Sequence, residues 1–216
     1  MEPAPPLQKA LIDGAKARGL RVNGGFHPTS DDGLHPGIQS VVLMSPGPDF
    51  WSVFTASHEY QGGHPDPMDR WSRRVLGRWA CELGAKAYFP FTTDPIRPFF
   101  QWALRSGRAW ASPVTLLVDD ENGLMTSYRG AIGLRERLDF TSRARPCDRC
   151  EAPCGGACPV GALTIEGYDV PRCITYLRDH PTSACRQNGC QVRLSCPVAT
   201  APAPEHAQFH MSAFIE

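Results

Sequence analysis

Eight cysteines in the last third of the chain are the residues whose type and spacing could do chemistry. The first four lie in the stretch "CDRCEAPCGGACP" and are Cys147, Cys150, Cys154 and Cys158. The other four are Cys173, Cys185, Cys190 and Cys196. Both groups end in a Cys-Pro pair. Because the chain opens without a secretory signal pattern, thiols this dense are more typical of metal ligands than of disulfides.

Three kinds of site are compatible with these cysteines, namely an iron–sulfur site, a zinc site and a set of thiols without metal. Zinc sites typically use paired C-x2-C knuckles, and the chain has one such pair, Cys147 and Cys150. The ninth cysteine, Cys81, lies apart in "RWACELGA". Its place in a helical pattern predicts a small buried apolar side chain.

The first four cysteines resemble the C-x2-C-x2-C-x3-C-P run of bacterial ferredoxins, with one extra residue before Cys154. In those proteins three thiolates of the run hold one [4Fe–4S] cluster and the fourth reaches a second cluster. The resemblance therefore implies two clusters. The ligands of cluster 1 would be Cys147, Cys150, Cys154 and Cys196. The ligands of cluster 2 would be Cys158, Cys173, Cys185 and Cys190.

Two longer stretches resemble proteins that work with corrinoids. "CPVGALTIEGYDVPRCITYLRDH" resembles the tail of the epoxyqueuosine reductases and, more loosely, of the reductive dehalogenases. "SPVTLLVDDENGLMTSYRGAIGL" resembles a strand pair of the cobalamin-processing CblC proteins, with Tyr128 and Arg129 in matching positions. These resemblances imply a nitroreductase-like fold, a cobalamin bound beside Tyr128 and Arg129, and clusters that pass it electrons from a redox partner protein or reductant.

The residues before the cysteines form the elements that must position such a site. Apolar side chains recur at helical spacing in several segments, clearest in Met68, Trp71, Val75, Trp79 and Leu83. Helices are expected at 7–19, near 50–58, at 68–83, at 97–107 and at 207–214. Strands are expected at 20–26, 38–44 and 85–91, with a strand pair across 113–134 that turns at 121–123. We expect an α/β (α+β) layer domain over residues 1–140 and a small cysteine-rich, ferredoxin-like domain over 141–216.

Outside the cysteines, the sequence offers few candidates for acid–base chemistry. His58, Glu59 and His64 lie together in the polar stretch "SHEYQGGHPDP" and are the local candidates for catalytic groups. A solvated loop with ordinary histidines is the alternative. His206 and His210 have the spacing of a metal-binding pair on a helix, but they fit a terminal packing helix more simply.

The composition argues against nucleic-acid binding and against a membrane-spanning segment. Twenty-two basic and 22 acidic residues balance, and no Lys/Arg run indicates a nucleic-acid surface. No apolar run approaches the length of a membrane span. We predict a cytoplasmic iron–sulfur redox protein that passes electrons to a corrinoid. The alternatives are a ferredoxin-like carrier without corrinoid and an interaction protein with structural zinc.

Overall fold

A computed structural model describes residues 6–215, and the chain divides into two compact units. Unit 1 contains the residues up to Arg108 together with Ser127–Ser142, and unit 2 contains Ala109–Thr126 together with the residues from Arg143 onward. The chain therefore passes between the units three times, and the last passage, after Ser142, lies close to the expected boundary at residue 140. The sequence did not reveal that 109–126 belongs with the cysteine-rich part.

Unit 1 is a mixed α/β unit whose helices follow the apolar periodicity of the sequence. Its helices are α1 (Pro6–Lys16), α2 (Phe50–Thr55), α3 (His58–Gln61), α4 (Pro67–Glu82) and α5 (Phe99–Arg105). In α4 the predicted stripe buries Trp71 and Trp79, whereas Arg73, Arg74 and Arg78 face solvent. Cys81, on the same helix, is exposed rather than buried, because it lies two residues after Trp79 and so about 200° around the helix from the stripe.

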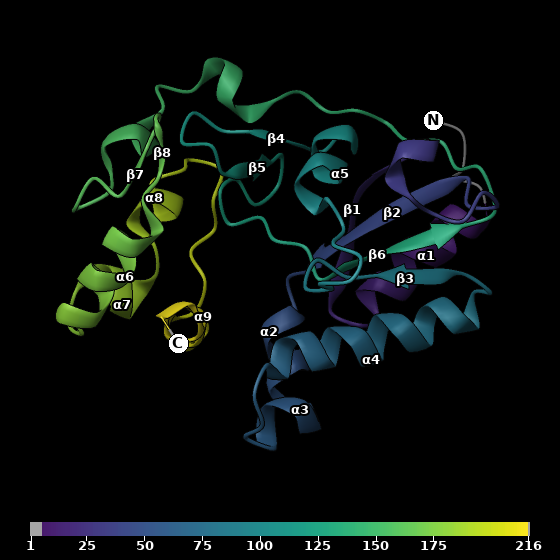
Figure 1. Ribbon diagram of the computed structural model, residues 1–216, viewed down its shortest axis with the longest axis horizontal. Helices are drawn as coiled ribbons and strands as arrows, with labels where there is room; N and C mark the ends of the chain where they lie inside the picture. The colour runs from purple at the N-terminus through teal and green to yellow at the C-terminus, as the bar shows by residue number, and fades with distance from the viewer. Residues whose placement is uncertain (1–5, 216) are drawn as a thin grey trace. The chain divides into compact units, whose positions relative to one another are not determined.

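A small antiparallel sheet forms the centre of unit 1 (Figure 1). Its strands are β1 (Leu20–Phe26), β2 (Ser40–Pro46), β3 (Lys86–Tyr88) and β6 (Gly130–Leu134), in the order β1-β2-β6-β3. Ile132 of β6 is paired with Val42 of β2 on one side and with Ala87 of β3 on the other. Both inner strands are buried on both faces, which explains their continuous apolar sequence.

Helices pack on both faces of this sheet. On one face, Gly130 allows close approach of α4, because a Cβ at this position would lie 2.6 Å from Leu76 Cδ1. On the other face, the Tyr88 ring meets Trp102 of α5 edge-on, with 5.9 Å between ring centroids. The sheet is therefore enclosed between α4 and α5, and its small residues determine how closely the helices approach.

The strand pair expected across 113–134 is wrong. β5 (Leu117–Asp119) pairs with β4 (Ala109–Ala111), a strand that the sequence reading missed. β6 instead joins the four-stranded sheet. The Asp119 carboxylate accepts hydrogen bonds from the backbone N–H groups of Glu121 and Asn122, so the turn is correctly placed but does not continue into a hairpin.

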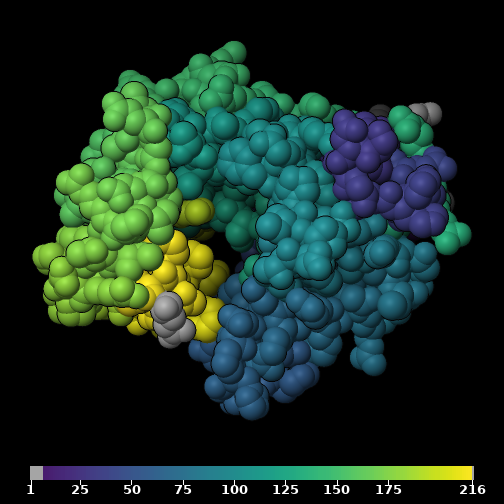
Figure 2. All heavy atoms as spheres, viewed as in Figure 1, coloured from purple at the N-terminus to yellow at the C-terminus, as the bar shows by residue number. Residues whose placement is uncertain are grey.

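Unit 2 consists of short elements joined by turns. They are β4, β5, two 3-10 turns (Pro146–Arg149 and Pro153–Gly156), β7 (Leu163–Thr164), β8 (Gly167–Tyr168), α6 (Val170–Asp179), α7 (Ala184–Asn188), α8 (Gln191–Leu194) and α9 (Pro204–Ile215). α9 lies against α6 and α7 (Figure 2). In that contact Met211 of α9 packs on Leu177 and Cys185.

The segment 109–126 contributes to the core of unit 2. Val118 and Leu124 from this segment form one buried cluster with Leu163 and Val192, and several cysteines pack against it. Burial of these apolar side chains explains why the segment leaves unit 1. No helix within residues 6–215 has the length and apolar character that a membrane crossing requires.

Candidate metal centre

The structure brings the eight cysteines of the motif together in two groups of four. Group 1 lines a small cavity and consists of Cys147, Cys150, Cys154 and Cys196. Group 2 lines a cavity of about 210 Å³ and consists of Cys158, Cys173, Cys185 and Cys190. All eight are free thiols. These are the same two sets of four that the ferredoxin resemblance implies.

Two consecutive tight turns build most of group 1. Cys147 lies in the first 3-10 turn, whose backbone ends at Cys150, and Cys154 lies in the second. Ala152, between them, has a left-handed backbone with φ of 54°, and its N–H lies 3.4 Å from Cys150 Sγ. The extra residue relative to ferredoxins falls in this loop. The left-handed turn at Ala152 therefore accommodates the insertion and points an N–H group at a sulfur.

Cys196 completes group 1 from the far end of the motif, and Gly123 makes room for it. A Cβ on Gly123 would lie 2.6 Å from Cys196 Sγ and 2.8 Å from the backbone nitrogen of Ala199. Gly123 also has φ of 55°, a conformation that favours glycine. Sequence reasoning treated Gly123 only as a turn residue. Its contact with Cys196 depends on tertiary packing.

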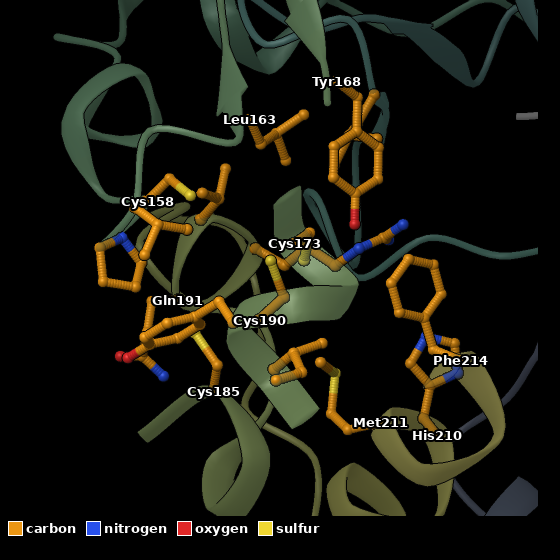
Figure 3. A pocket seen from close by; sticks show the side chains of 17 residues that line it. Cys158, Leu163, Tyr168, Cys173, Cys185, Cys190, Gln191, His210, Met211 and Phe214 are labelled. Atoms are coloured by element: carbon orange, nitrogen blue, oxygen red, sulfur yellow. The ribbon is translucent and has the colours of Figure 1, made fainter. Parts of the chain in front are cut away.

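Short helices build group 2 around its cavity (Figure 3). Cys158 Sγ accepts a hydrogen bond from Ala162 N–H at 3.2 Å. Cys173 lies in α6, which begins where Asp169 accepts the N–H of Arg172. Cys185 lies in α7, and Cys190 precedes the first residue of α8. The cavity walls are mostly apolar and include Leu116, Leu163, Leu177, Met211 and Phe214.

Two polar side chains point into the group 2 cavity. The Tyr168 hydroxyl points into the cavity in Figure 3, where Cys173 also lies, and burial together with the neighbouring Cys173 raises the pKa of Tyr168. Arg193 lies beside Cys190 and donates to the carbonyl oxygen of Leu124 at 2.7 Å. Sequence reasoning missed both residues. Each lies a few positions from a cysteine, but that spacing alone does not indicate where its side chain points.

A cationic side chain, Arg145, lies beside group 1. Arg145 lies beside Cys147 and donates to the carbonyl oxygen of Ala111 at 2.7 Å. Its guanidinium also lies 3.9 Å from the Asp148 carboxylate, and its side chain is 39% exposed. The positive charge near group 1 is therefore shared with an acid and with solvent.

Burial makes the thiolate form of several cysteines unfavourable. It raises the pKa of Cys147, Cys154, Cys173 and Cys185, and neighbouring cysteines of the same group raise it further. Thiolates at these positions therefore need a positive partner, and a bound metal centre is one that also binds sulfur.

The two groups differ in how well they fit a metal centre. Within residues 6–215, no three His, Cys, Asp or Glu side chains converge closely enough to hold a single metal ion. Instead, the four cysteines of each group line a cavity. The group 2 space of about 210 Å³ suits a polyatomic centre, and all four of its sulfur donors are cysteines. The group 1 space is only about 20 Å³, so the turns carrying Cys147 and Cys154 must move apart to admit a cluster.

The candidate catalytic residues lie in unit 1. Glu59 is buried and accepts two hydrogen bonds from Arg74, at 2.5 and 2.9 Å. These bonds lower the pKa of Glu59 from 4.5 to about 2, although burial acts in the opposite direction. His58 is 74% exposed with its Nε2 3.2 Å from Glu59, and His64 is exposed. At neutral pH Glu59 is therefore an ionised partner of Arg74, which holds α3 against α4.

The candidate corrinoid-binding residues make contacts within unit 1. The Tyr128 hydroxyl accepts a hydrogen bond from Asn23 Nδ2 at 3.3 Å, and Tyr128 is buried. Arg129 donates to Asp69 at 3.3 Å, and burial lowers the pKa of Arg129. These two side chains therefore contribute to packing between β6 and its neighbours.

The histidine pair of the terminal helix is divided between two surroundings. His210 of α9 is exposed at the edge of the group 2 cavity, where Figure 3 shows it beside Phe214. His206 is half-buried, and burial lowers its pKa.

Comparison of the chain with models of protein families, with curated proteins and with solved structures gave no match.

Proposed function

We propose that the chain is an iron–sulfur redox protein that holds one [4Fe–4S] cluster in each cysteine group and passes single electrons to an acceptor. The observation that carries the proposal is the gathering of eight free cysteines into two groups of four, with the membership expected for two ferredoxin-like clusters. When bound, each cluster supplies one-electron chemistry.

Three features of the sites support this proposal. All eight expected ligands are cysteines, which is the donor set of [4Fe–4S] clusters. Backbone N–H groups of Ala152 and Ala162 point at sulfur atoms, one in each group. Leu163 and Val192 form part of the apolar surroundings, and Cys154 and Cys185 are buried within them. The free thiols also fit the reducing cytoplasm, which we propose as the compartment.

We propose a corrinoid as the electron acceptor on the strength of the sequence resemblance. The mixed α/β architecture of unit 1, with its four-stranded antiparallel sheet, is compatible with a nitroreductase-like fold. Tyr128 and Arg129 are engaged with Asn23 and Asp69, so they add no independent support for a corrinoid site. A ferredoxin-like carrier that serves a different acceptor uses the same eight cysteines.

Metal analysis of anaerobically prepared protein tests the two clusters. Cys147→Ser and Cys173→Ser should each reduce bound iron and acid-labile sulfide by about half, because each removes a ligand from one group only. Cys81→Ser is the matched control and should retain all the iron, since Cys81 is exposed on α4 in unit 1. Colourless protein with stoichiometric zinc would overturn the proposal in favour of a structural zinc site.

Spectroscopy with cob(II)alamin tests the acceptor. Addition of the protein should shift the cob(II)alamin spectrum if unit 1 binds the corrinoid, and dithionite-reduced protein should then reduce it. Full iron content with no spectral shift at saturating protein would exclude the corrinoid and favour the ferredoxin-like carrier.

A further inference from the structure

A buried hydroxyl group, that of Ser112, belongs to the wall of the group 1 cavity. Ser112 lines this cavity together with the four cysteines of the group. The residue is only 6% exposed, and its Oγ has no hydrogen-bond partner among residues 6–215. Buried polar side chains are nearly always hydrogen-bonded, so an unpaired hydroxyl in the wall of a candidate site calls for a physical reason.

Backbone hydrogen bonds hold Ser112 beside the cysteines. Ser112 directly follows β4, where its N–H donates to the carbonyl oxygen of Leu116 at 2.8 Å and its own carbonyl oxygen accepts from Thr115 at 3.0 Å. The preceding residue, Ala111, accepts the 2.7 Å bond from Arg145, the residue directly before the first 3-10 turn of group 1. The backbone of Ser112 is therefore fixed and satisfied next to the site, whereas its hydroxyl is not.

We infer that the Ser112 hydroxyl is a hydrogen-bond donor to a sulfur atom of the cluster in group 1. The inference rests on the proposed function and adds to it a residue outside the cysteine motif. The group 1 space of about 20 Å³ is too small for a cluster, so the bond forms only when the turns carrying Cys147 and Cys154 move apart. We call the arrangement in the structure the closed arrangement.

The physical reason is the cost of a buried hydroxyl without a partner. In the closed arrangement this cost falls on the folded chain, because Ser112 has given up its bonds to water and gained none from residues 6–215. The sulfur atoms of iron–sulfur clusters accept hydrogen bonds, so a cluster in group 1 removes the cost. Ser112 therefore destabilises the metal-free chain and stabilises the group 1 cluster, and these two effects have opposite signs.

A buried water molecule is the competing partner for this hydroxyl. The group 1 space is large enough for one, since a water needs about 10–15 Å³. A stable buried water also needs two to four polar partners, and the other side chains of the wall are cysteines, prolines and apolar residues such as Val118 and Leu124. A water bound to Ser112 would remove its cost in the metal-free chain, so the stability of that chain separates the two explanations.

Urea unfolding of the metal-free chain tests the first effect. Ser112→Ala removes the hydroxyl and should raise the urea midpoint. Ser195→Ala is the matched control next to Cys196, because the Ser195 hydroxyl is already bonded to the carbonyl oxygen of Val192 at 2.8 Å. The control should lower the midpoint. An unchanged or lower midpoint for Ser112→Ala would overturn the inference, in favour of a bound water or of a purely structural role.

Release of iron to a chelator tests the second effect. The Cys173→Ser chain isolates the group 1 cluster, and there Ser112→Ala should speed iron release about 10-fold, the typical effect of losing a hydrogen bond to a metal ligand. The Cys147→Ser chain, which retains the group 2 cluster, should release iron at an unchanged rate. Equal rates with and without the Ser112 hydroxyl in the Cys173→Ser chain would overturn the inference.

Electron–nuclear double resonance of the reduced Cys173→Ser chain provides a direct readout. Transfer to deuterated buffer should reveal one fewer exchangeable proton coupled to the cluster in Ser112→Ala, with no loss in Ser195→Ala. The same couplings in both variants would overturn the inference at full iron content. Wild-type protein without iron would instead overturn the proposed function, so the two failures are distinguishable.

Discussion

Replacing Gly123 by alanine tests whether the segment 109–126 shapes the group 1 site. Two costs combine in this variant. An alanine at φ of 55° adopts the left-handed backbone at a cost of about 1–2 kcal/mol. Its Cβ would lie 2.6 Å from Cys196 Sγ, and relieving such overpacking costs about 1–3 kcal/mol more. We therefore expect Gly123→Ala to lose about 2–5 kcal/mol of unfolding free energy.

The overlap with Cys196 has a second, chemical consequence. Relief of the overlap moves Cys196 away from the other three cysteines of group 1, because the nearby Ala199 backbone leaves the Cβ no other space. Bound iron should therefore fall by about half, with the group 2 cluster retained. Iron analysis and electron paramagnetic resonance measure this loss, and urea unfolding measures the stability.

Gly84→Ala is the matched control for this variant. Gly84 has φ of 61°, and its Cβ position has no heavy atom within 4 Å. The control should therefore lose only the backbone cost of about 1–2 kcal/mol and retain all its iron. The reasoning is refuted if Gly123→Ala binds as much iron as Gly84→Ala and unfolds at the same urea concentration.

The remaining predictions concern unit 1. Glu59→Gln should destabilise the chain by about 1–3 kcal/mol at pH 7, because it breaks a buried pair with Arg74. Since the pKa of Glu59 falls from 4.5 to about 2 on folding, this stabilisation is present above pH 4.5 and is lost as pH falls toward 2. The urea midpoints of wild type and variant should therefore converge as pH falls across that range. A constant difference between the two midpoints at every pH would contradict the pairing. Gly14→Ala should destabilise by about 1–3 kcal/mol despite its better helix propensity, because its Cβ would lie 2.6 Å from the Trp79 ring. Gly77→Ala, with no atom within 4 Å of its Cβ, should instead stabilise by about 0.5–1 kcal/mol, and equal midpoints for the two alanine variants would disprove the close packing.

Local patterns predicted most of the elements in unit 1. The stripe containing Trp71 and Trp79 predicts α4, and the β-branched and apolar run around Val42 predicts β2. These patterns succeed because a helix that buries one face must repeat apolar side chains every three to four residues. A strand that is buried on both faces must be apolar along its whole length. The patterns fail for β4, a three-residue strand too short to show a period, so the strand expected before the turn at 121–123, which contains β5, was given the wrong partner.

The exposed Cys81 shows a similar limit. Each residue turns a helix by about 100°, so Cys81 lies about 200° around α4 from Trp79 and off the apolar stripe. Cys81 lies next to the buried residues Trp79 and Ala80, yet its side chain faces solvent. The width of the buried face depends on the partner elements, which the pattern does not describe.

By itself, the sequence determined which residues are the candidate ligands. Cysteine type and the short spacing of Cys147, Cys150 and Cys154 require tight turns, and such turns keep neighbouring thiols close whatever the rest of the chain does. Resemblance to ferredoxins then implied the two sets of four. The cavities that the cysteines line follow the same division.

Only the tertiary structure decided what surrounds the sulfur atoms. Gly123 meets Cys196, and Leu124 anchors Arg193, because the segment 109–126 buries its apolar side chains in unit 2. Tyr168 and Cys173 come to line one cavity in the same way, through packing between separate elements. The physical reason is the range of the interactions. Hydrogen bonds within a turn depend on a few adjacent residues, whereas the packing that aims these side chains depends on burial between segments distant in sequence.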